Sequence, residues 1–134
     1  MEITTKVPSA KQYVDLRIDT NMGPKSLEKA EIALQNSLHV VTIWDMDELV
    51  GFGRIVGDGA ISYVVSDIMV ASTHQGLGIG KRIMSEIDKY FETNTDKDAY
   101  IILLANKPAN KLYEQYKFED SSPKSIGMKR NQLK

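Results

Sequence analysis

The sequence predicts an α/β fold in which a central, twisted sheet of about six to seven strands, with both parallel and antiparallel neighbours, is flanked by about four helices. Two observations support this. Short apolar or alternating runs typical of strands are interleaved with longer runs whose apolar residues recur every three to four positions. Glycine, proline, asparagine, aspartate and serine gather between these runs, as they do in turns. The expected order is β-α-α-β-β-β-α-β-α-β, with room for one further strand.

The first half of the chain begins with an alternating, β-branched strand. Ser9 and Ser26 each precede an amphipathic run and are typical N-caps, so each predicts the start of a helix. The next two apolar runs flank a polar turn at 45–48 and indicate a hairpin. The expected strands are 2–7, 39–44 and 49–56.

The second half alternates strands and helices. Two apolar runs have the character of central strands, and the run after the glycines has a one-sided apolar stripe typical of a helix. Pro108 suits the first turn of a helix, where its missing N–H costs little. The expected strands are 62–70, 100–105 and 125–129, and the expected helices are 79–91 and 108–116.

Composition narrows the class of protein. The 134 residues are 42% hydrophobic and 26% charged with a net charge of −1, so we expect one globular domain over 1–134 and no nucleic-acid or membrane surface. The chain has no cysteine, which excludes a disulfide framework, a cysteine zinc site and a cysteine acyl-enzyme. Neither a signal peptide nor an apolar run of membrane-spanning length is visible, so a cytoplasmic location is expected.

The most informative segment lies between the apolar strand residues 68–70 and the helix that opens at Ile79. Gly76, Gly78 and Gly80 alternate there, and glycine adopts positive φ and leaves its amide uncovered. The first N–H groups of a helix lack intrahelical partners, so this turn is suited to a phosphate or pyrophosphate. A glycine-rich turn without a ligand is the alternative. The predicted phosphate site comprises Gln75, Gly76, Leu77, Gly78, Ile79, Gly80 and Lys81.

Two common phosphate loops do not fit this segment. The Walker loop requires glycine where the chain has Gln75 and Ser or Thr where it has Arg82. The dinucleotide fingerprint requires glycine where the chain has Lys81.

The pattern that does fit is Gln/Arg-x-x-Gly-x-Gly/Ala, which resembles the acetyl-CoA loop of the GNAT superfamily of N-acetyltransferases. A second segment, 106–118, is similar to that family's Asn…Asn-x-x-Ala/Leu-Tyr-Glu-x-x-Gly-Phe pattern, apart from Lys117 in place of glycine. One helix and one strand separate the two motifs, as in the family, and the resemblance covers nearly the whole chain.

The resemblance implies acetyl-CoA as cosubstrate and acetyl transfer to a primary amine. It implies that the backbone of the strand before the loop binds the pantetheine arm, as an added strand would. Asn106 matches the asparagine that contacts the CoA arm, and Asn110 is either a second contact or only a polar helix residue. Lys81 and Arg82 could add charge near the phosphates. The implied arm-binding strand residues are Ile68, Met69 and Val70.

The resemblance makes Tyr113 the general acid that protonates the leaving thiolate, with a core tyrosine as the alternative. Tyr113 follows Asn106 by seven residues, two helical turns, so both are expected to face the same way. Some relatives carry a glutamate base where this chain has Ile101. Asp67, which interrupts an apolar strand, is a candidate base, but it could equally pair with Arg54.

The expected reaction is direct transfer in a ternary complex, because no cysteine can carry the acetyl group. The acceptor is a small-molecule or peptide amine. No metal is expected, since His39 and His74 stand apart from any ligand pattern. A non-catalytic CoA-binding module of the same fold is the alternative function. An exposed sheet edge near the C-terminal strand could pair two copies into a homodimer.

Overall fold

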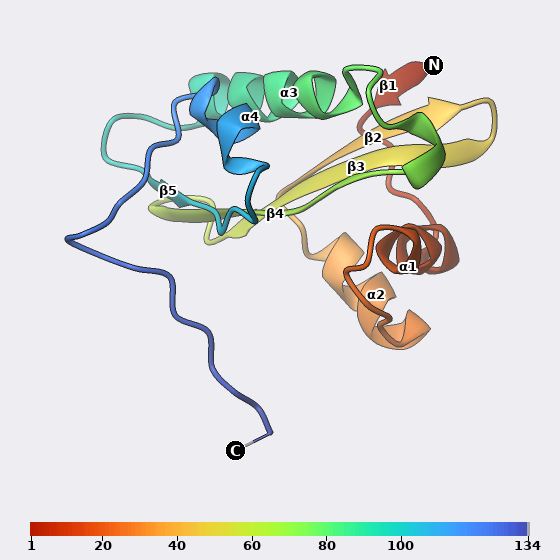
Figure 1. The fold of residues 1–134 in the computed structure, drawn as a ribbon, viewed down its shortest axis with the longest axis horizontal. Coiled ribbons are helices and arrows are strands. Elements are labelled where there is room, and N and C mark those ends of the chain that lie inside the picture. The colour runs from red at the N-terminus through yellow and green to blue at the C-terminus, as the bar shows by residue number, and fades with distance from the viewer. Residues whose placement is uncertain (134) are drawn as a thin grey trace. The chain divides into compact units, whose positions relative to one another are not determined.

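A computed structural model describes residues 1–133, which divide into two compact units. The first unit, 1–103, contains the sheet and three helices; the second begins at Leu104 and contains one short helix. Figure 1 shows each element. The elements are β1 (Glu2–Thr4), α1 (Ala10–Asp19), α2 (Leu27–Gln35), β2 (His39–Asp45), β3 (Glu48–Gly57), β4 (Ser62–Val70), the 3-10 turn η1 (Ser72–His74), α3 (Ile79–Asn94), β5 (Tyr100–Ile102) and α4 (Asn110–Glu114).

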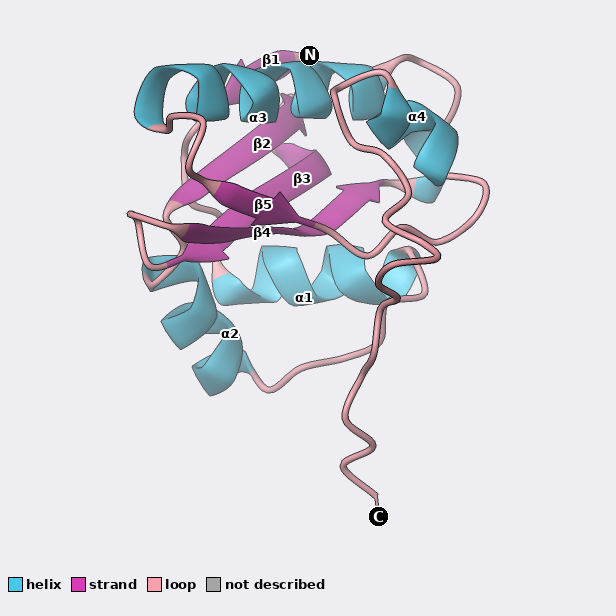
Figure 2. Ribbon diagram, turned by 90° about the vertical axis from the view of Figure 1, so that its left-hand side faces the viewer, coloured by secondary structure: helices cyan, strands magenta, loops and turns pink. Residues whose placement is uncertain are grey.

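The first unit is built on one five-stranded sheet in the order β1-β2-β3-β4-β5. Neighbouring strands are antiparallel except β4 and β5, which are parallel, so the sheet is mixed as predicted. β5 pairs with β4 only at Ser62, Tyr63 and Val64, the first third of that strand. Figure 2 shows β4 continuing past the end of β5.

Helices cover both faces of this sheet (Figure 2). The apolar side of α3 packs on β2, β3 and β4. A Cβ atom on Gly51 or Gly53 would lie 2.8 Å from the side chains of Ile79 or Ile83, so glycine is what lets α3 approach β3. On the other face, α1 packs against the sheet through an edge-to-face contact between Tyr13 and Phe52.

The two predicted N-caps are confirmed. The Ser9 side chain accepts a hydrogen bond from the Gln12 backbone and the Gln12 side chain returns one to Ser9, a capping box. The Ser26 side chain accepts from the backbone of Lys29. Because both signals are local, they fix where α1 and α2 begin.

The predicted strand count was too high, and three ranges were too long. β1 ends at Thr4 and β5 at Ile102, while α4 has five residues. Residues 125–129 form no strand in the described chain; Ser125 instead closes a turn by donating its backbone N–H to Ser121. Gly127, which weakens a strand, lies in this segment, and a Cβ there would meet the Leu104 side chain at 2.5 Å.

Candidate active site

The glycine segment forms an open turn at the start of α3. Gly76 and Gly78 have φ of +77° and +78°, a backbone region that L side chains rarely adopt. A Cβ on either residue would find no atom within 4 Å, so close packing is not the reason for glycine there. Gly78 is the N-cap of α3 and has no side chain to cap it. The turn therefore combines an uncapped helix start with uncovered backbone, and it fits a phosphate group.

Of the apolar side chains at this turn, one is buried in the core and the other is exposed to solvent. Ile79 is 1% exposed and packs into the core beside Gly51, so only its backbone can meet a ligand. Leu77 is 58% exposed. Gln75 donates its side-chain N–H to the Val70 carbonyl at 2.8 Å, which ties the turn to the end of β4. This contact explains a glutamine at the first position of the motif.

Two carboxylates outside the motif hold η1, the segment between β4 and the glycines. Asp19, at the end of α1, accepts hydrogen bonds from the backbone and hydroxyl of Ser72, and these bonds lower the pKa of Asp19. Asp45, at the end of β2, lies 2.8 Å from His74 Nε2. Sequence reasoning missed both tethers, because each partner lies at least 29 residues away along the chain.

The predicted arm-binding residues lie at the far end of β4. Met69 is 1% exposed and pairs with Phe52 of β3, and Val70 pairs with Gly51. Because β5 pairs with β4 only as far as Val64, the other side of β4 at 68–70 lies beyond the β5 pairing. The backbone of this stretch fits an extended ligand that adds as a strand. Within the first unit, these three residues end β4, and η1 connects them to the glycine turn.

Asp67 lies at a bulge in β4. Between the pairs Phe52–Met69 and Arg54–Ser66, Gly53 of β3 faces two residues of β4, and Asp67 has φ of +57°. Its carboxylate accepts from Arg54 Nε at 2.8 Å, which confirms the pairing foreseen as the alternative to a base.

Two side chains of α1 complete the surroundings of Asp67. The Tyr13 hydroxyl donates at 2.5 Å and Arg17 Nη1 at 3.1 Å. Burial raises the pKa of Asp67, but the hydrogen bonds and the two guanidinium charges outweigh it and hold that pKa below its usual value. A carboxylate engaged in this way is a weak proton acceptor, which favours the structural interpretation over the base.

In the second unit, α4 begins at Asn110, so Asn106 precedes the helix and the helical spacing that was expected to turn it the same way as Tyr113 does not apply. The Asn106 carbonyl instead accepts from the Ala109 backbone in the turn that precedes the helix. The Asn110 amide donates to Glu114 at 3.3 Å. Tyr113 is half-buried, and burial raises its pKa above the usual value. Lys117, where the family pattern has glycine, has φ of +72°.

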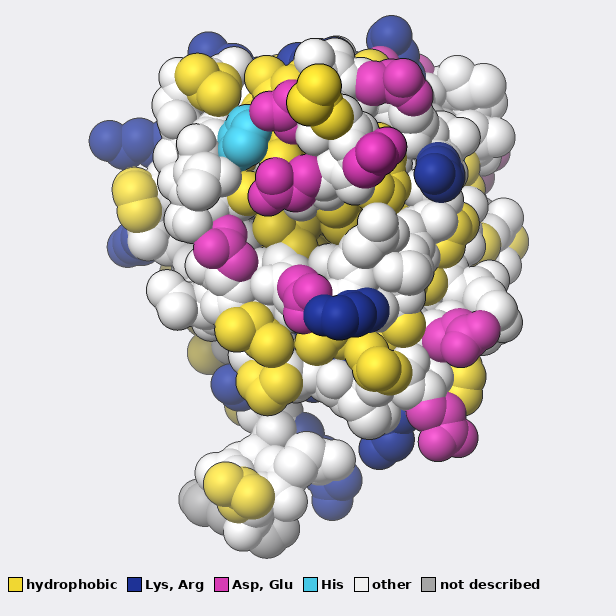
Figure 3. Space-filling model, turned by 90° about the vertical axis from the view of Figure 1, so that its right-hand side faces the viewer, with side chains coloured by type: hydrophobic (Ala, Val, Ile, Leu, Met, Phe, Trp, Pro, Cys, Tyr) yellow, Lys and Arg dark blue, Asp and Glu magenta, His cyan; other side chains and the backbone are white. Residues whose placement is uncertain are grey.

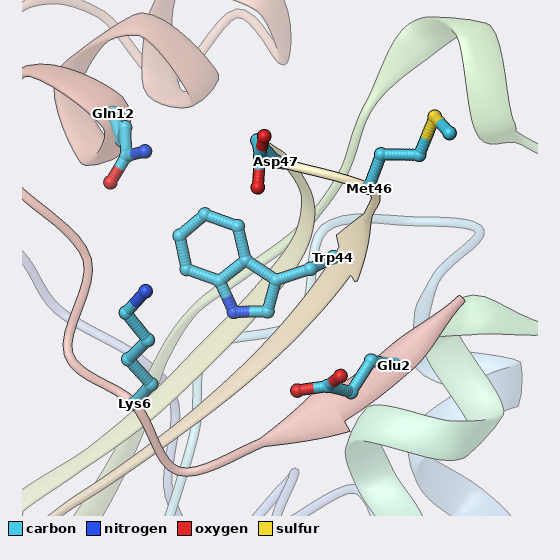
Figure 4. A pocket seen from close by; sticks show the side chains of 6 residues that line it. All are labelled: Glu2, Lys6, Gln12, Trp44, Met46 and Asp47. Atoms are coloured by element: carbon cyan, nitrogen blue, oxygen red, sulfur yellow. The ribbon is translucent and has the colours of Figure 1, made fainter.

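A separate hollow of about 280 Å³ contains none of the predicted site residues. Its floor is Trp44, with the Lys6 ammonium 5.1 Å from the ring centroid (Figure 4). Figure 3 shows that acidic side chains gather on the side of the molecule that carries the β2–β3 turn. The aromatic residues Phe52 and Tyr63 are buried in the core and do not line the hollow. The hollow is lined by Glu2, Lys6, Gln12, Trp44, Met46 and Asp47.

Residues 1–133 hold no cluster of three or more side chains suited to a metal ion, and none of their helices is long and apolar enough to cross a bilayer.

Comparison with known families decides the class of protein. The model of the acetyltransferase (GNAT) domain matches residues 10–128. The chain belongs to the GNAT acetyltransferase family. The matched range includes β4, the glycine turn and Tyr113, so the two motifs that suggested the family lie inside it.

Curated relatives of this GNAT chain match part of it. It is 34% identical over 67 residues to an uncharacterized N-acetyltransferase ycf52-like protein of Prochlorococcus marinus. The aligned residues make up 47% of this chain and 37% of that protein. It is 30% identical over 69 residues to the uncharacterized N-acetyltransferase ycf52 of Porphyra purpurea, covering 48% and 40%. The matches thus span less than half the length of these relatives.

Solved structures also match this GNAT chain, two of them over nearly its whole length. A protein of unknown function from meticillin-resistant Staphylococcus aureus, described as a probable acetyltransferase, is 38% identical with a TM-score of 0.92, covering 97% of this chain and 98% of that one. A GNAT family acetyltransferase of Streptococcus pneumoniae is 27% identical with a TM-score of 0.76, covering 99% and 97%. An aminoglycoside 6′-N-acetyltransferase complexed with coenzyme A shares the fold at 24% identity and a TM-score of 0.59, covering 70% and 57%.

Proposed function

We propose that this chain is an N-acetyltransferase that moves the acetyl group of acetyl-CoA directly to a primary amine in a ternary complex. The observation that carries the proposal is the turn at Gly76 and Gly78, which opens α3 with positive φ and uncovered backbone. A helix start of this kind favours a pyrophosphate. Family membership supports the acetyl-CoA assignment, and the solved relative with bound coenzyme A shows the same fold.

In this proposal the backbone N–H groups of 76–81 bind the pyrophosphate, and the backbone of 68–70 binds the pantetheine arm. Gln75 holds the turn through its bond to the Val70 carbonyl, so its role is structural. Asn106 and Asn110 remain candidates for contacts with the arm. The backbone N–H groups of Met69 and Val70 are candidates to polarise the thioester carbonyl.

The amine attacks the thioester carbonyl carbon, a C–N bond forms and the C–S bond breaks. Tyr113 gives its hydroxyl proton to the departing sulfur, the nitrogen of the new amide gives its surplus proton to solvent, and solvent returns a proton to the Tyr113 phenolate. Burial raises the pKa of Tyr113, so the phenol stays protonated at neutral pH and can act as donor. With no cysteine in the chain, the protein acts mainly by positioning the two reactants.

We propose that solvent, rather than Asp67, takes the proton of the amine. Asp67 already accepts hydrogen bonds from Tyr13, Arg17 and Arg54, and Ile101 stands where some relatives have glutamate. The same two observations support a second candidate function, a CoA-binding module of this fold that has lost turnover.

Two measurements test the proposal. Titration calorimetry with coenzyme A, ATP and NAD should show heat of binding for coenzyme A alone. Acetyl-CoA is then mixed with the chain and a panel of amines: tyramine, spermidine, Nα-acetyl-lysine amide, kanamycin and a peptide with a free N-terminus. Thiol release is followed with a disulfide reagent, to which a chain without cysteine contributes no background.

The two candidate functions give different results. An acetyltransferase releases thiol in proportion to acetylated amine, and Tyr113→Phe lowers the rate. A binding module binds coenzyme A and releases none with any amine. Binding of ATP without binding of coenzyme A would overturn both.

A further inference from the structure

The Arg17 side chain donates hydrogen bonds to four different residues. It is 10% exposed and lies between α1 and the sheet. Nη1 donates to Asp67 at 3.1 Å and to the Tyr13 hydroxyl at 3.3 Å. These contacts fix the guanidinium against the β4 bulge, two residues before Met69.

The other nitrogens of Arg17 hold the connection between α1 and α2. Nη2 donates to the Met22 carbonyl at 2.8 Å and Nε to the Gly23 carbonyl at 3.0 Å. This connection contains two residues with positive φ, Asn21 at +62° and Gly23 at +84°, so its backbone has an uncommon shape. One guanidinium therefore joins two consecutive carbonyls of the connection to a carboxylate on β4.

The position of the connection gives this link a consequence for the reaction. The glycine turn opens α3, which covers one face of the sheet, whereas α1 packs on the other face. Direct transfer requires the amine to reach the thioester from a direction that the cosubstrate does not occupy. The face that carries α1 and the α1–α2 connection meets that requirement.

We propose that Arg17 is a positioning residue that fixes the α1–α2 connection against the β4 bulge and so shapes the amine-binding side of the site. This inference rests on the proposed function. The guanidinium suits the role because its planar fork directs several N–H donors at once, which a lysine ammonium on a flexible stem cannot reproduce.

Arg54 provides a matched control. It pairs with the same carboxylate at 2.8 Å, but its Nη1 donates to the Ser37 hydroxyl at 3.3 Å, outside the α1–α2 connection. Arg17→Lys and Arg54→Lys both keep a positive charge beside Asp67. Only Arg17→Lys removes the fork that holds Met22 and Gly23.

The test compares these two variants with the unmodified chain, using the panel amine that is acetylated fastest. Arg17→Lys should raise the KM for that amine about tenfold while the Kd for coenzyme A changes less than about twofold. Arg54→Lys should leave both within about twofold. Equal changes in the two variants, or an equal rise of amine KM and coenzyme A Kd in Arg17→Lys, would overturn the proposal.

A second variant covers the case in which Arg17→Lys fails to fold. Gly23→Ala strains the connection at its φ of +84°, where the added Cβ meets no atom within 4 Å, and leaves the charged cluster intact. It should raise the amine KM with the coenzyme A Kd unchanged. An unchanged amine KM in this variant contradicts the proposal.

If the proposed function itself is wrong, the unmodified chain will acetylate no amine of the panel, which distinguishes this case from failure of the positioning role. The positioning role can still be tested by measuring the rate of limited trypsin cleavage at Lys25, an exposed residue of the connection. Cleavage there should be about five times faster in Arg17→Lys than in Arg54→Lys. Equal cleavage rates would show that Arg17 does not hold the connection.

Discussion

Asp45 and His74 are joined by a 2.8 Å contact between Oδ2 and Nε2, which ties the end of β2 to η1. The other ring nitrogen lies 2.8 Å from the Thr73 hydroxyl, so both nitrogens of His74 are engaged. With Nε2 protonated, the imidazole donates to Asp45 and accepts from Thr73. Since η1 leads directly into Gln75 and the glycines, Asp45 supports the proposed pyrophosphate site from outside the motif.

Asp45→Ala should therefore weaken coenzyme A binding. Loss of one hydrogen bond of about 1 kcal/mol frees η1, and we expect the Kd to rise about fivefold. Calorimetry measures this directly. Asp47→Ala, at an exposed position of the same hairpin, serves as the control and should leave the Kd unchanged. A Kd that does not respond to Asp45→Ala would mean that the tether is irrelevant to the ligand.

Gly78→Ala should separate backbone strain from ligand binding when compared with Gly59→Ala. Both glycines have φ near +77°, at +78° and +76°, so each alanine should destabilise the fold by about 1 kcal/mol. Only Gly78 lies at the start of α3, where a methyl group would cover the amides. We expect a rise of about tenfold in the Kd for coenzyme A with Gly78→Ala and no change with Gly59→Ala. Similar Kd values for the two variants would show that the glycine turn does not bind coenzyme A.

Features set by nearby residues could be predicted from the sequence. Ser9 and Ser26 cap helices because each hydroxyl accepts a hydrogen bond from a backbone N–H only three residues later. The glycine turn could be predicted because its three glycines alternate within five consecutive residues. The β2–β3 hairpin also follows from two neighbouring apolar runs and the polar turn between them.

Features that join distant residues could not be predicted in the same way. The contact between Arg17 and Asp67 spans fifty residues and depends on a bulge that shifts the β3–β4 register. No pattern in either strand fixes that register. The prediction of a strand at 125–129 was wrong for a related reason. A strand must pair with the edge of a sheet, and a short apolar run does not specify which edge is available.

Asp67→Asn should destabilise the fold, because it leaves the buried guanidinium of Arg17 and the partly buried one of Arg54 without their carboxylate. Removing one partner of a buried ion pair costs about 3–5 kcal/mol. The folded pKa of Asp67 lies below its usual value, so its contribution is present above that usual value and is lost as pH falls through the folded pKa. In denaturant unfolding, the free energy of unfolding of Asp67→Asn should be well below that of the unmodified chain at pH 7, and this difference should become smaller below about pH 4.

The matched control for Asp67 is Asp15→Asn, which breaks an exposed ion pair with Lys11 on α1. An exposed pair contributes about 0.2–1 kcal/mol, so this variant should stay close to the unmodified chain at every pH. A gap for Asp67→Asn that stays constant between pH 7 and pH 3 would contradict the linkage of the cluster to that carboxylate.

Tyr113→Phe should lower kcat about a hundredfold, because general acid catalysis contributes that order of rate and phenylalanine keeps the ring but has no proton to give. The Kd for coenzyme A should not change. Tyr116→Phe, three residues later, is the matched control and should retain activity. The phenol donates only when protonated, and burial raises its pKa above the usual value of 10. Activity should therefore show no loss from this group between pH 7 and about pH 9, and a Tyr113→Phe variant as fast as the unmodified chain would assign the proton to another donor.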